Sequence, residues 1–101
     1  MQTCYISGKI SGLPYRQTYL KFLFRELLIW CNGLKPINPM RIIPKQWDYE
    51  TQLDYGKLLA AKADCFYVSH NFNRSFGAKA ELRAYRRTGK KSIIYFRFWN
   101  R

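Results

Sequence analysis

Hydrophobic and polar positions follow two different periods along this chain, and these periods predict its elements. Short runs rich in β-branched and aromatic residues are typical of strands, whereas apolar residues spaced three and four apart are typical of helices. The strand-like runs are residues 3–7, 35–39, 64–69 and 92–96. The helix-like segments are residues 15–31, 49–61 and 75–87. Because strand and helix alternate, we expect an α/β domain with about four parallel strands and helices on both faces.

The segment 15–31 has two apolar sets at helical spacing. The main stripe, which we expect to face the core, consists of Leu20, Leu23, Phe24, Leu27, Leu28 and Cys31. The second set lies off this stripe and consists of Tyr19, Phe22, Ile29 and Trp30. A small domain buries only part of such a surface, so the second set is expected either to pack against the loop 42–47 or to form a homodimer interface. Asn32 and Gly33 are expected to end the helix.

Length and composition exclude several classes of protein. The chain has 101 residues, of which 48% are hydrophobic, so we expect one folded domain over residues 1–101 rather than a disordered segment. It contains no run of about 18 apolar residues, and residues 1–7 lack the layout of a secretory signal. Three widely spaced cysteines, Cys4, Cys31 and Cys65, do not form the close pairs of a zinc site. We therefore expect no membrane partner, no metal and no cofactor.

The charge of the chain is strongly positive and unevenly distributed. Eighteen Lys and Arg against six Asp and Glu give a formal net charge of +12. Residues 74–101 hold nine of these basic residues and one acid, Glu81. Such a chain attracts polyphosphate whatever its fold, so one hypothesis is a nucleic-acid-binding protein that uses residues 83–91. The other is that the charge attracts a small phosphorylated ligand to a site beside Glu81.

Ligands of open parallel sheets bind beyond the carboxyl ends of the strands, which directs attention to the loops 7–13, 38–41 and 69–77. In the first loop, Gly8 and Gly12 let the backbone approach a ligand, and the helix that follows favours an anion at its N-terminus. An ordinary tight turn between a strand and a helix is compatible with the same residues. The loop alone therefore does not distinguish a ligand-binding loop from such a turn. His70 is expected at the same edge of the sheet. It either acts as a proton shuttle or has no role in the site. The run 97–101 alternates basic and aromatic residues. This pattern is compatible with binding of single-stranded nucleic acid and with an extension of the last strand.

The third helix opens with a short motif that ends in the single acid of the C-terminal part. Its residues are Ser75-Phe76-Gly77-Ala78-Lys79-Ala80-Glu81, and small side chains share the face of Glu81. Basic residues follow on the neighbouring face, and nearby cations lower a carboxyl pKa. We therefore expect Glu81 to stay ionised, as a nucleophile requires. The alternative is an ordinary ion pair within a basic helix.

Taken together, these motifs resemble those of a known family. The residues that carry the resemblance are Tyr5-Ile6-Ser7-Gly8-Lys9-Ile10-Ser11-Gly12-Leu13-Pro14, Asn38-Pro39, Trp47, Ala63-Asp64 and Ser75-x-Gly77-Ala78-x-x-Glu81. They are similar to the DUF4406 family of short phage and bacterial proteins. This group is related to nucleoside 2-deoxyribosyltransferases and 2′-deoxynucleoside 5′-phosphate N-hydrolases. The resemblance extends over about residues 3–96 and implies a flavodoxin-like or Rossmann-like three-layer domain.

The resemblance also implies a chemistry and a set of site residues. Glu81 stands where the enzymes have the nucleophile that attacks the deoxyribosyl anomeric carbon, and Tyr5 matches the tyrosine beside it. Ser75 matches the phosphate-contacting position of the monophosphate hydrolases, which implies a deoxynucleoside 5′-monophosphate as substrate, with base release or base exchange. Further substrate-binding positions implied in this way are Ser7, Gly8, Lys9, Gly12, Asn38 and Gly77. The expected location is the cytoplasm of a bacterium or of a phage-infected host cell, and a homodimer partner is expected because relatives often complete the pocket from a neighbour.

Two positions depart from the pattern of the relatives. Lys9 stands where the hydrolases have a smaller residue that helps to bind phosphate, a role that a lysine can fill through its charge. The second departure concerns an acid of the relatives. They carry an aspartate that assists the base, eight residues before the aspartate of the third strand. Counting back from Asp64 reaches Gly56, whereas alignment on Trp47 selects Asp54 and requires two extra residues in the helix. Asp54 is the candidate for this role, with Asp48 and Glu50 as alternatives. Loss of this aspartate would instead favour a non-catalytic module that binds a nucleotide or a signalling molecule.

Overall fold

A computed structural model describes residues 2–10, 12–69 and 74–95 of the chain. The predictions for His70 and for residues 97–101 fall outside these residues. The elements are β1 (Thr3–Ser7), α1 (Tyr15–Cys31), β2 (Lys35–Ile37), α2 (Pro39–Ile42), α3 (Tyr49–Lys62), β3 (Cys65–Val68), α4 (Phe76–Arg87) and β4 (Ile93–Tyr95). Within the described part of the chain, no helix is both long enough and apolar enough to cross a membrane.

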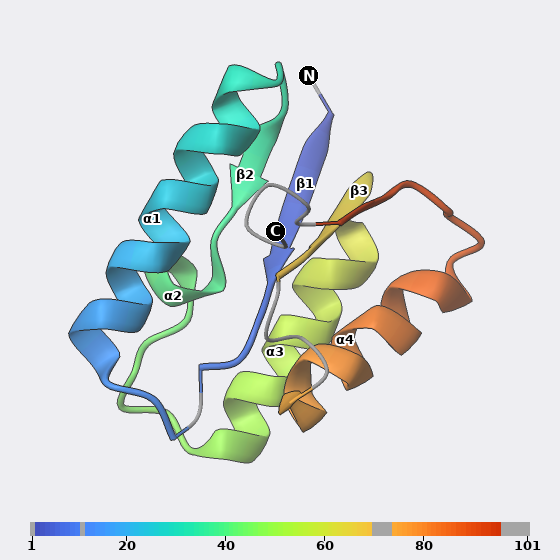
Figure 1. Cartoon of the computed structure of the whole chain (residues 1–101). Coiled ribbons are helices and arrows are strands. Elements are labelled where there is room, and N and C mark those ends of the chain that lie inside the picture. Colours follow the sequence, from blue (N-terminus) through green and yellow to red (C-terminus); the bar gives the residue numbers. More distant parts are fainter. Residues whose placement is uncertain (1, 11, 70–73, 96–101) are drawn as a thin grey trace.

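The four strands form one parallel sheet with the order β2-β1-β3-β4. Thr3 pairs with Lys35, Cys4 with Cys65, and Phe66 with Ile93. Helix α1 covers one face of the sheet, whereas α3 and α4 cover the other (Figure 1). The structure therefore confirms the predicted α/β architecture with parallel strands and helices on both faces.

Each face of the sheet has its own hydrophobic core. Because side chains alternate along a strand, Cys4 and Ile6 of β1 point toward α1, and Tyr5 points toward α3 and α4. The first core contains Cys4, Ile6, Phe22, Ile29, Met40, Cys65 and Tyr67. The second contains Tyr5, Ala60, Ala63, Phe66, Val68 and Tyr85. Tyr5 is fully buried and stacks on Phe66 with ring centroids 5.8 Å apart, which fixes the direction of its hydroxyl group.

The predicted core face of α1 is wrong. Leu20 and Leu27 are each 58% exposed, and Phe24 and Cys31 are also exposed. The side chains that α1 buries are Thr18, Phe22, Arg25 and Ile29. The buried face of α1 includes the two polar residues Thr18 and Arg25. A prediction from the spacing of apolar residues does not identify such positions. Thr18 satisfies its hydroxyl group by donating to the carbonyl of Pro14 at 2.8 Å. The exposed apolar surface of α1 is therefore not the predicted one, because Phe22 and Ile29 belong to the core.

A short helix replaces the predicted end of the second strand. The strand stops at Ile37, and α2 begins at Pro39 rather than continuing as extended chain. Asn38 is the N-cap residue, and its side-chain oxygen accepts from the backbone N–H of Met40 at 3.0 Å. Asparagine followed by proline is a favourable helix start, since proline has no N–H to leave unpaired in the first turn.

The strand order reverses between β1 and β3. The candidate site lies at the carboxyl ends of these two strands. The chain leaves β1 toward α1 on one face, and it leaves β3 toward α4 on the other. The loops that follow the two strands therefore diverge at the carboxyl edge of the sheet, where ligands of such folds bind.

Candidate active site

A cavity of about 570 Å³ lies at this carboxyl edge of the sheet. Its wall comes from the loop after β1, from α2 and the segment that follows it, and from the first turns of α3 and α4. The lining residues are Gly8, Lys9, Ile10, Tyr15, Pro39, Met40, Ile43, Lys45, Trp47, Tyr49, Gln52, Leu53, Arg74, Ser75, Phe76, Gly77, Ala78 and Glu81. Nine of these 18 residues come from the three loops that the sequence selected, and the others come mainly from the segment 43–53.

Glu81 and Tyr5 meet beside the cavity. The hydroxyl group of Tyr5 donates a hydrogen bond of 2.8 Å to Oε2 of Glu81. Helix α4, which carries Glu81, begins at Ser75, whose hydroxyl accepts from the Ala78 N–H at 3.0 Å. Two predicted catalytic residues, far apart in the sequence, are thus in direct contact.

The expectation that basic neighbours keep Glu81 ionised is wrong. Burial raises the pKa of Glu81 from its usual value to about 7, although the hydrogen bond from Tyr5 acts in the opposite direction. The cations of α4 do not compensate, because Lys79, Arg83, Arg86 and Arg87 are exposed to solvent. Exposed charges are screened by water, whereas the loss of hydration at a partly buried carboxylate is not. Near neutral pH, Glu81 is therefore present in both protonation states.

Gly56 explains how the carboxylate becomes buried. A β-carbon placed on Gly56 would lie 2.4 Å from Oε2 of Glu81 and 3.3 Å from the Tyr5 hydroxyl. Helix α3 therefore packs its backbone directly on the Glu81–Tyr5 pair, which a larger residue would displace. Helix α3 is continuous from Tyr49 to Lys62. The position that faces Glu81 is the one reached by direct counting, and it holds glycine.

Asp54 does not reach the cavity. Its side chain is 76% exposed and lies 3.7 Å from the ammonium group of Lys57, one turn along α3. Among the described residues that line the cavity, Glu81 is the only one with a carboxylate. The geometry therefore gives Asp54 no contact through which to assist a base held beside Glu81.

The opening loop contributes only part of its predicted residues to the cavity. Gly8 and Lys9 line it, whereas Gly12 is exposed and serves the turn through its positive φ of 81°. Ser7 is 1% exposed, and its hydroxyl group has no hydrogen-bond partner among the described residues. Strand alternation places Ser7 on the same sheet face as Tyr5, one pleat nearer the carboxyl edge. Ser7 is not among the residues that line the cavity.

The remaining predicted residues divide into two groups. Ser75 and Gly77 line the cavity at the start of α4. Asn38 does not line it, because its amide nitrogen donates to Oε2 of Glu26 at 2.6 Å and its oxygen caps α2. Asn38 therefore holds α2 in place, and the neighbouring residues Pro39 and Met40 form the wall.

The aromatic residues in the wall of the cavity were not predicted from the sequence as site residues. Tyr15, Trp47 and Tyr49 line the cavity, and the ammonium group of Lys45 lies 4.9 Å from the centroid of the Tyr15 ring. The amide nitrogen of Gln52 donates to the carbonyl groups of Pro44, Lys45 and Trp47, which ties the segment before α3 to that helix. The signal in the sequence was the position of this segment, which follows β2 and must lie at the same sheet edge.

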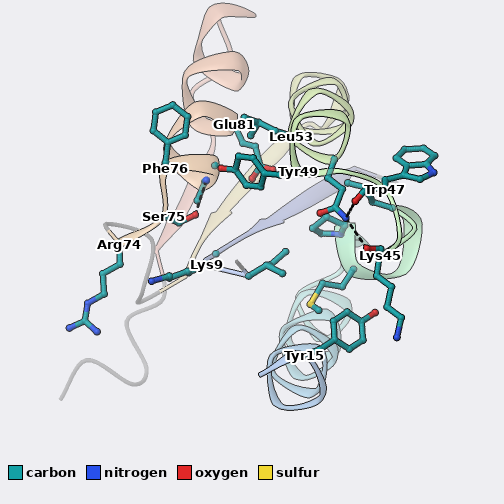
Figure 2. A pocket seen from close by; sticks show the side chains of 18 residues that line it. Lys9, Tyr15, Lys45, Trp47, Tyr49, Leu53, Arg74, Ser75, Phe76 and Glu81 are labelled. Atoms are coloured by element: carbon teal, nitrogen blue, oxygen red, sulfur yellow. Dashed lines mark hydrogen bonds between the residues drawn. The ribbon is translucent and has the colours of Figure 1, made fainter. Parts of the chain in front are cut away.

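The two sides of the cavity differ in composition, and each carries at least one basic and one aromatic side chain. Figure 2 shows Lys9, Arg74 and Ser75 on one side, Trp47, Tyr15 and Lys45 on the other, and Glu81 between them beside Tyr49 and Leu53. The described residues include no group of three or more His, Cys, Asp or Glu side chains that could hold a metal ion.

These features define the class of protein: a small parallel α/β domain with a cavity at the switch point of its sheet. The chain belongs to the DUF4406 family, described as a domain of unknown function, whose family model matches residues 2–95. None of the curated proteins matches the chain.

Proposed function

We propose that this protein cleaves or exchanges the N-glycosidic bond of a deoxynucleoside 5′-monophosphate, with Glu81 as the nucleophile. The observation that carries the proposal is the contact between the Tyr5 hydroxyl and the Glu81 carboxylate beside a cavity of ligand size. A carboxylate that attacks carbon must be partly ionised and held in one orientation. A pKa of about 7 meets the first requirement near neutral pH, and Tyr5 meets the second.

The division of the cavity suits the three parts of such a substrate. The side with Tyr15 offers flat apolar surface to a base. The Trp47 indole points away from the cavity and packs on Tyr55. The opposite side offers Lys9 and Arg74, together with the N-terminus of α4, to a phosphate group. A sugar between the two ends would lie beside Glu81.

The proposed reaction has two displacement steps. A carboxylate oxygen of Glu81 forms a bond to C1′ while the bond from C1′ to the base nitrogen breaks, and its electron pair leaves with the base. The departing base takes its proton from water, because the lining residues supply no second carboxylate. Water then attacks C1′ of the glycosyl-enzyme, which releases deoxyribose 5-phosphate and restores the carboxylate. Attack by a second base instead gives base exchange.

One observation favours a second candidate function. Gly56 faces Glu81, and it is the position that counting back from Asp64 matches to the assisting aspartate of the enzymes that the sequence resembles. A protein without this group holds a ligand but lacks an acid for the leaving base. The second candidate is therefore a non-catalytic module that binds a nucleotide or a signalling molecule.

Base release distinguishes the two candidates. Purified protein is incubated with each of the four deoxynucleoside 5′-monophosphates, and free base is quantified by chromatography. We expect release that Glu81→Gln abolishes and that Asp54→Asn, a matched isosteric change at an exposed carboxylate, leaves unchanged. Thermal stabilisation by a nucleotide without any release would establish the binding module, since a ligand of the native state raises the melting temperature. If none of the four nucleotides releases base or stabilises the protein, the N-glycosidase and the nucleotide-binding module are both refuted.

A further inference from the structure

Arg25 is an arginine buried between α1 and the sheet. It is 4% exposed and belongs to the face of α1 that packs on the sheet. The ion pairs between described residues join Arg41 to Glu26 and Lys57 to Asp54, so neither includes Arg25. A buried charge without a counter-ion is costly, and arginine side chains are seldom left in that state.

The groups that face the guanidinium carry no compensating charge. Its central carbon lies 5.1 Å from the centroid of the Phe22 ring, a contact that offsets only part of the lost hydration. Tyr67 also faces it from β3, and burial raises the pKa of this phenol to about 12, so it is neutral at physiological pH. Burial lowers the pKa of Arg25. The positive charge is nevertheless retained, because an arginine side chain does not deprotonate at neutral pH.

The guanidinium reaches the inner side of the opening loop. A β-carbon placed on Gly8 would lie 3.4 Å from Nη1 of Arg25 and 2.9 Å from the Ser69 hydroxyl. Gly8 itself lines the cavity. The loop backbone at Gly8 is therefore the layer between Arg25 on one side and the ligand space on the other, and glycine is required for this close approach.

We propose that Arg25 supplies the buried positive charge for a phosphate monoester bound on the cavity side of Gly8 and Lys9. Arg25 acts through the loop and does not touch the ligand, so it is a positioning residue. A charge at this depth acts through protein rather than water, which makes it more effective than an exposed lysine at the same distance. The identity of the anion as the 5′-phosphate of a nucleotide rests on the proposed function, whereas phosphate binding itself does not.

Inorganic phosphate is the probe that tests this role. The dissociation constant is measured by thermal shift and by calorimetry at constant ionic strength, with chloride as the reference anion. We expect wild-type protein to bind phosphate, Arg25→Met to bind it roughly tenfold more weakly or worse, and Arg25→Lys to retain most of the affinity. The matched control is Arg16→Met, which removes the same charge from an exposed position of the same helix.

Several results would overturn the proposal. Phosphate that stabilises wild-type protein no more than chloride does would remove the site. If Arg16→Met and Arg25→Met weaken phosphate binding equally, the effect is due to the net charge of the protein and not to the position of Arg25. If Arg25→Lys binds as poorly as Arg25→Met, the positive charge is not the cause. Should Arg25→Met fail to fold, Arg25→Gln replaces it in the same comparison.

The result can also be separated from the proposed function. Phosphate binding that depends on Arg25 in a protein that releases no base supports this inference and refutes the N-glycosidase. If the protein releases base and Arg25→Met leaves its phosphate affinity unchanged, only the role of Arg25 is refuted. For an active protein, Arg25→Met is expected to raise KM for the 5′-monophosphate while kcat changes little.

Discussion

The hydrogen bond between Tyr5 and Glu81 makes a quantitative prediction for Tyr5→Phe. The substitution keeps the ring, which is buried and stacked on Phe66, and removes only the hydroxyl group that donates to Oε2 of Glu81. Hydrogen bonds to charged groups contribute about 1.5–3 kcal/mol, and one pKa unit corresponds to about 1.4 kcal/mol. Loss of this bond is therefore expected to raise the Glu81 pKa by about one to two units.

The starting value places this change in an accessible pH range. The pKa of Glu81 is about 7, so the nucleophilic form of wild-type protein appears as the pH rises through neutrality. The pH dependence of kcat/KM reports groups of the free enzyme, so its ascending limb is expected near pH 7 and is shifted upward in Tyr5→Phe. The same titration can be followed without turnover by the ¹³C signal of the Glu81 carboxyl group.

A matched control isolates the hydrogen bond from the loss of a buried hydroxyl group. Tyr85 lies in the same core, and its hydroxyl donates to the carbonyl groups of Asp64 and Ser92 rather than to Glu81. Tyr85→Phe is therefore expected to lower stability without moving the titration midpoint of Glu81. An unchanged midpoint in Tyr5→Phe, or a wild-type midpoint near the usual value of 4.5, would refute the reasoning.

Three further predictions follow from the packing. Because the folded-state pKa of Glu81 lies above the unfolded value, its protonated form favours folding below about pH 4.5, and this contribution is lost as the pH rises toward 7. In urea denaturation, Glu81→Gln should match wild-type protein at pH 4.5 and exceed it by up to about 3 kcal/mol at pH 8; equal stabilities at pH 8 would contradict this. Gly56→Ala should displace the carboxylate and reduce kcat/KM by about 100-fold with an unchanged circular dichroism spectrum, because a β-carbon there lies 2.4 Å from Oε2; unchanged activity would show that the contact is unimportant. The exposed Leu20, Phe24 and Leu27 of α1 predict a homodimer of twice 12.1 kDa in sedimentation, which Leu27→Glu should dissociate; a wild-type monomer at micromolar concentration would refute it.

The order and type of the elements could be predicted because local chemistry specifies them. The bounds of β1 and α1 agree with the sequence pattern, and α1 ends where Gly33 adopts a positive φ of 77°. The orientation of α1 about its axis could not be predicted in this way. Its apolar residues surround most of the helix, and the buried face includes Arg25, whose burial depends on Gly8 and on strands that are distant in the sequence.

The candidate site shows the same division. The carboxyl edge of the sheet and the loops around the cavity followed from topology, and the motif that ends in Glu81 selected the carboxylate. The protonation behaviour of Glu81 did not follow, because it depends on how closely α3 packs at Gly56. Counting residues gave both Gly56 and Asp54 as alternatives, and only the direction of each residue on a continuous helix distinguished them.

Covalent trapping tests the central claim most directly. Protein is mixed with each deoxynucleoside 5′-monophosphate, quenched with acid within the first turnover, digested, and analysed by mass spectrometry. The proposed reaction predicts a deoxyribosyl 5-phosphate adduct on the peptide that contains Glu81 and its absence in Glu81→Gln. Base release that persists in Glu81→Gln, or release by wild-type protein with the Glu81 peptide unmodified, would contradict the role of this carboxylate as the nucleophile.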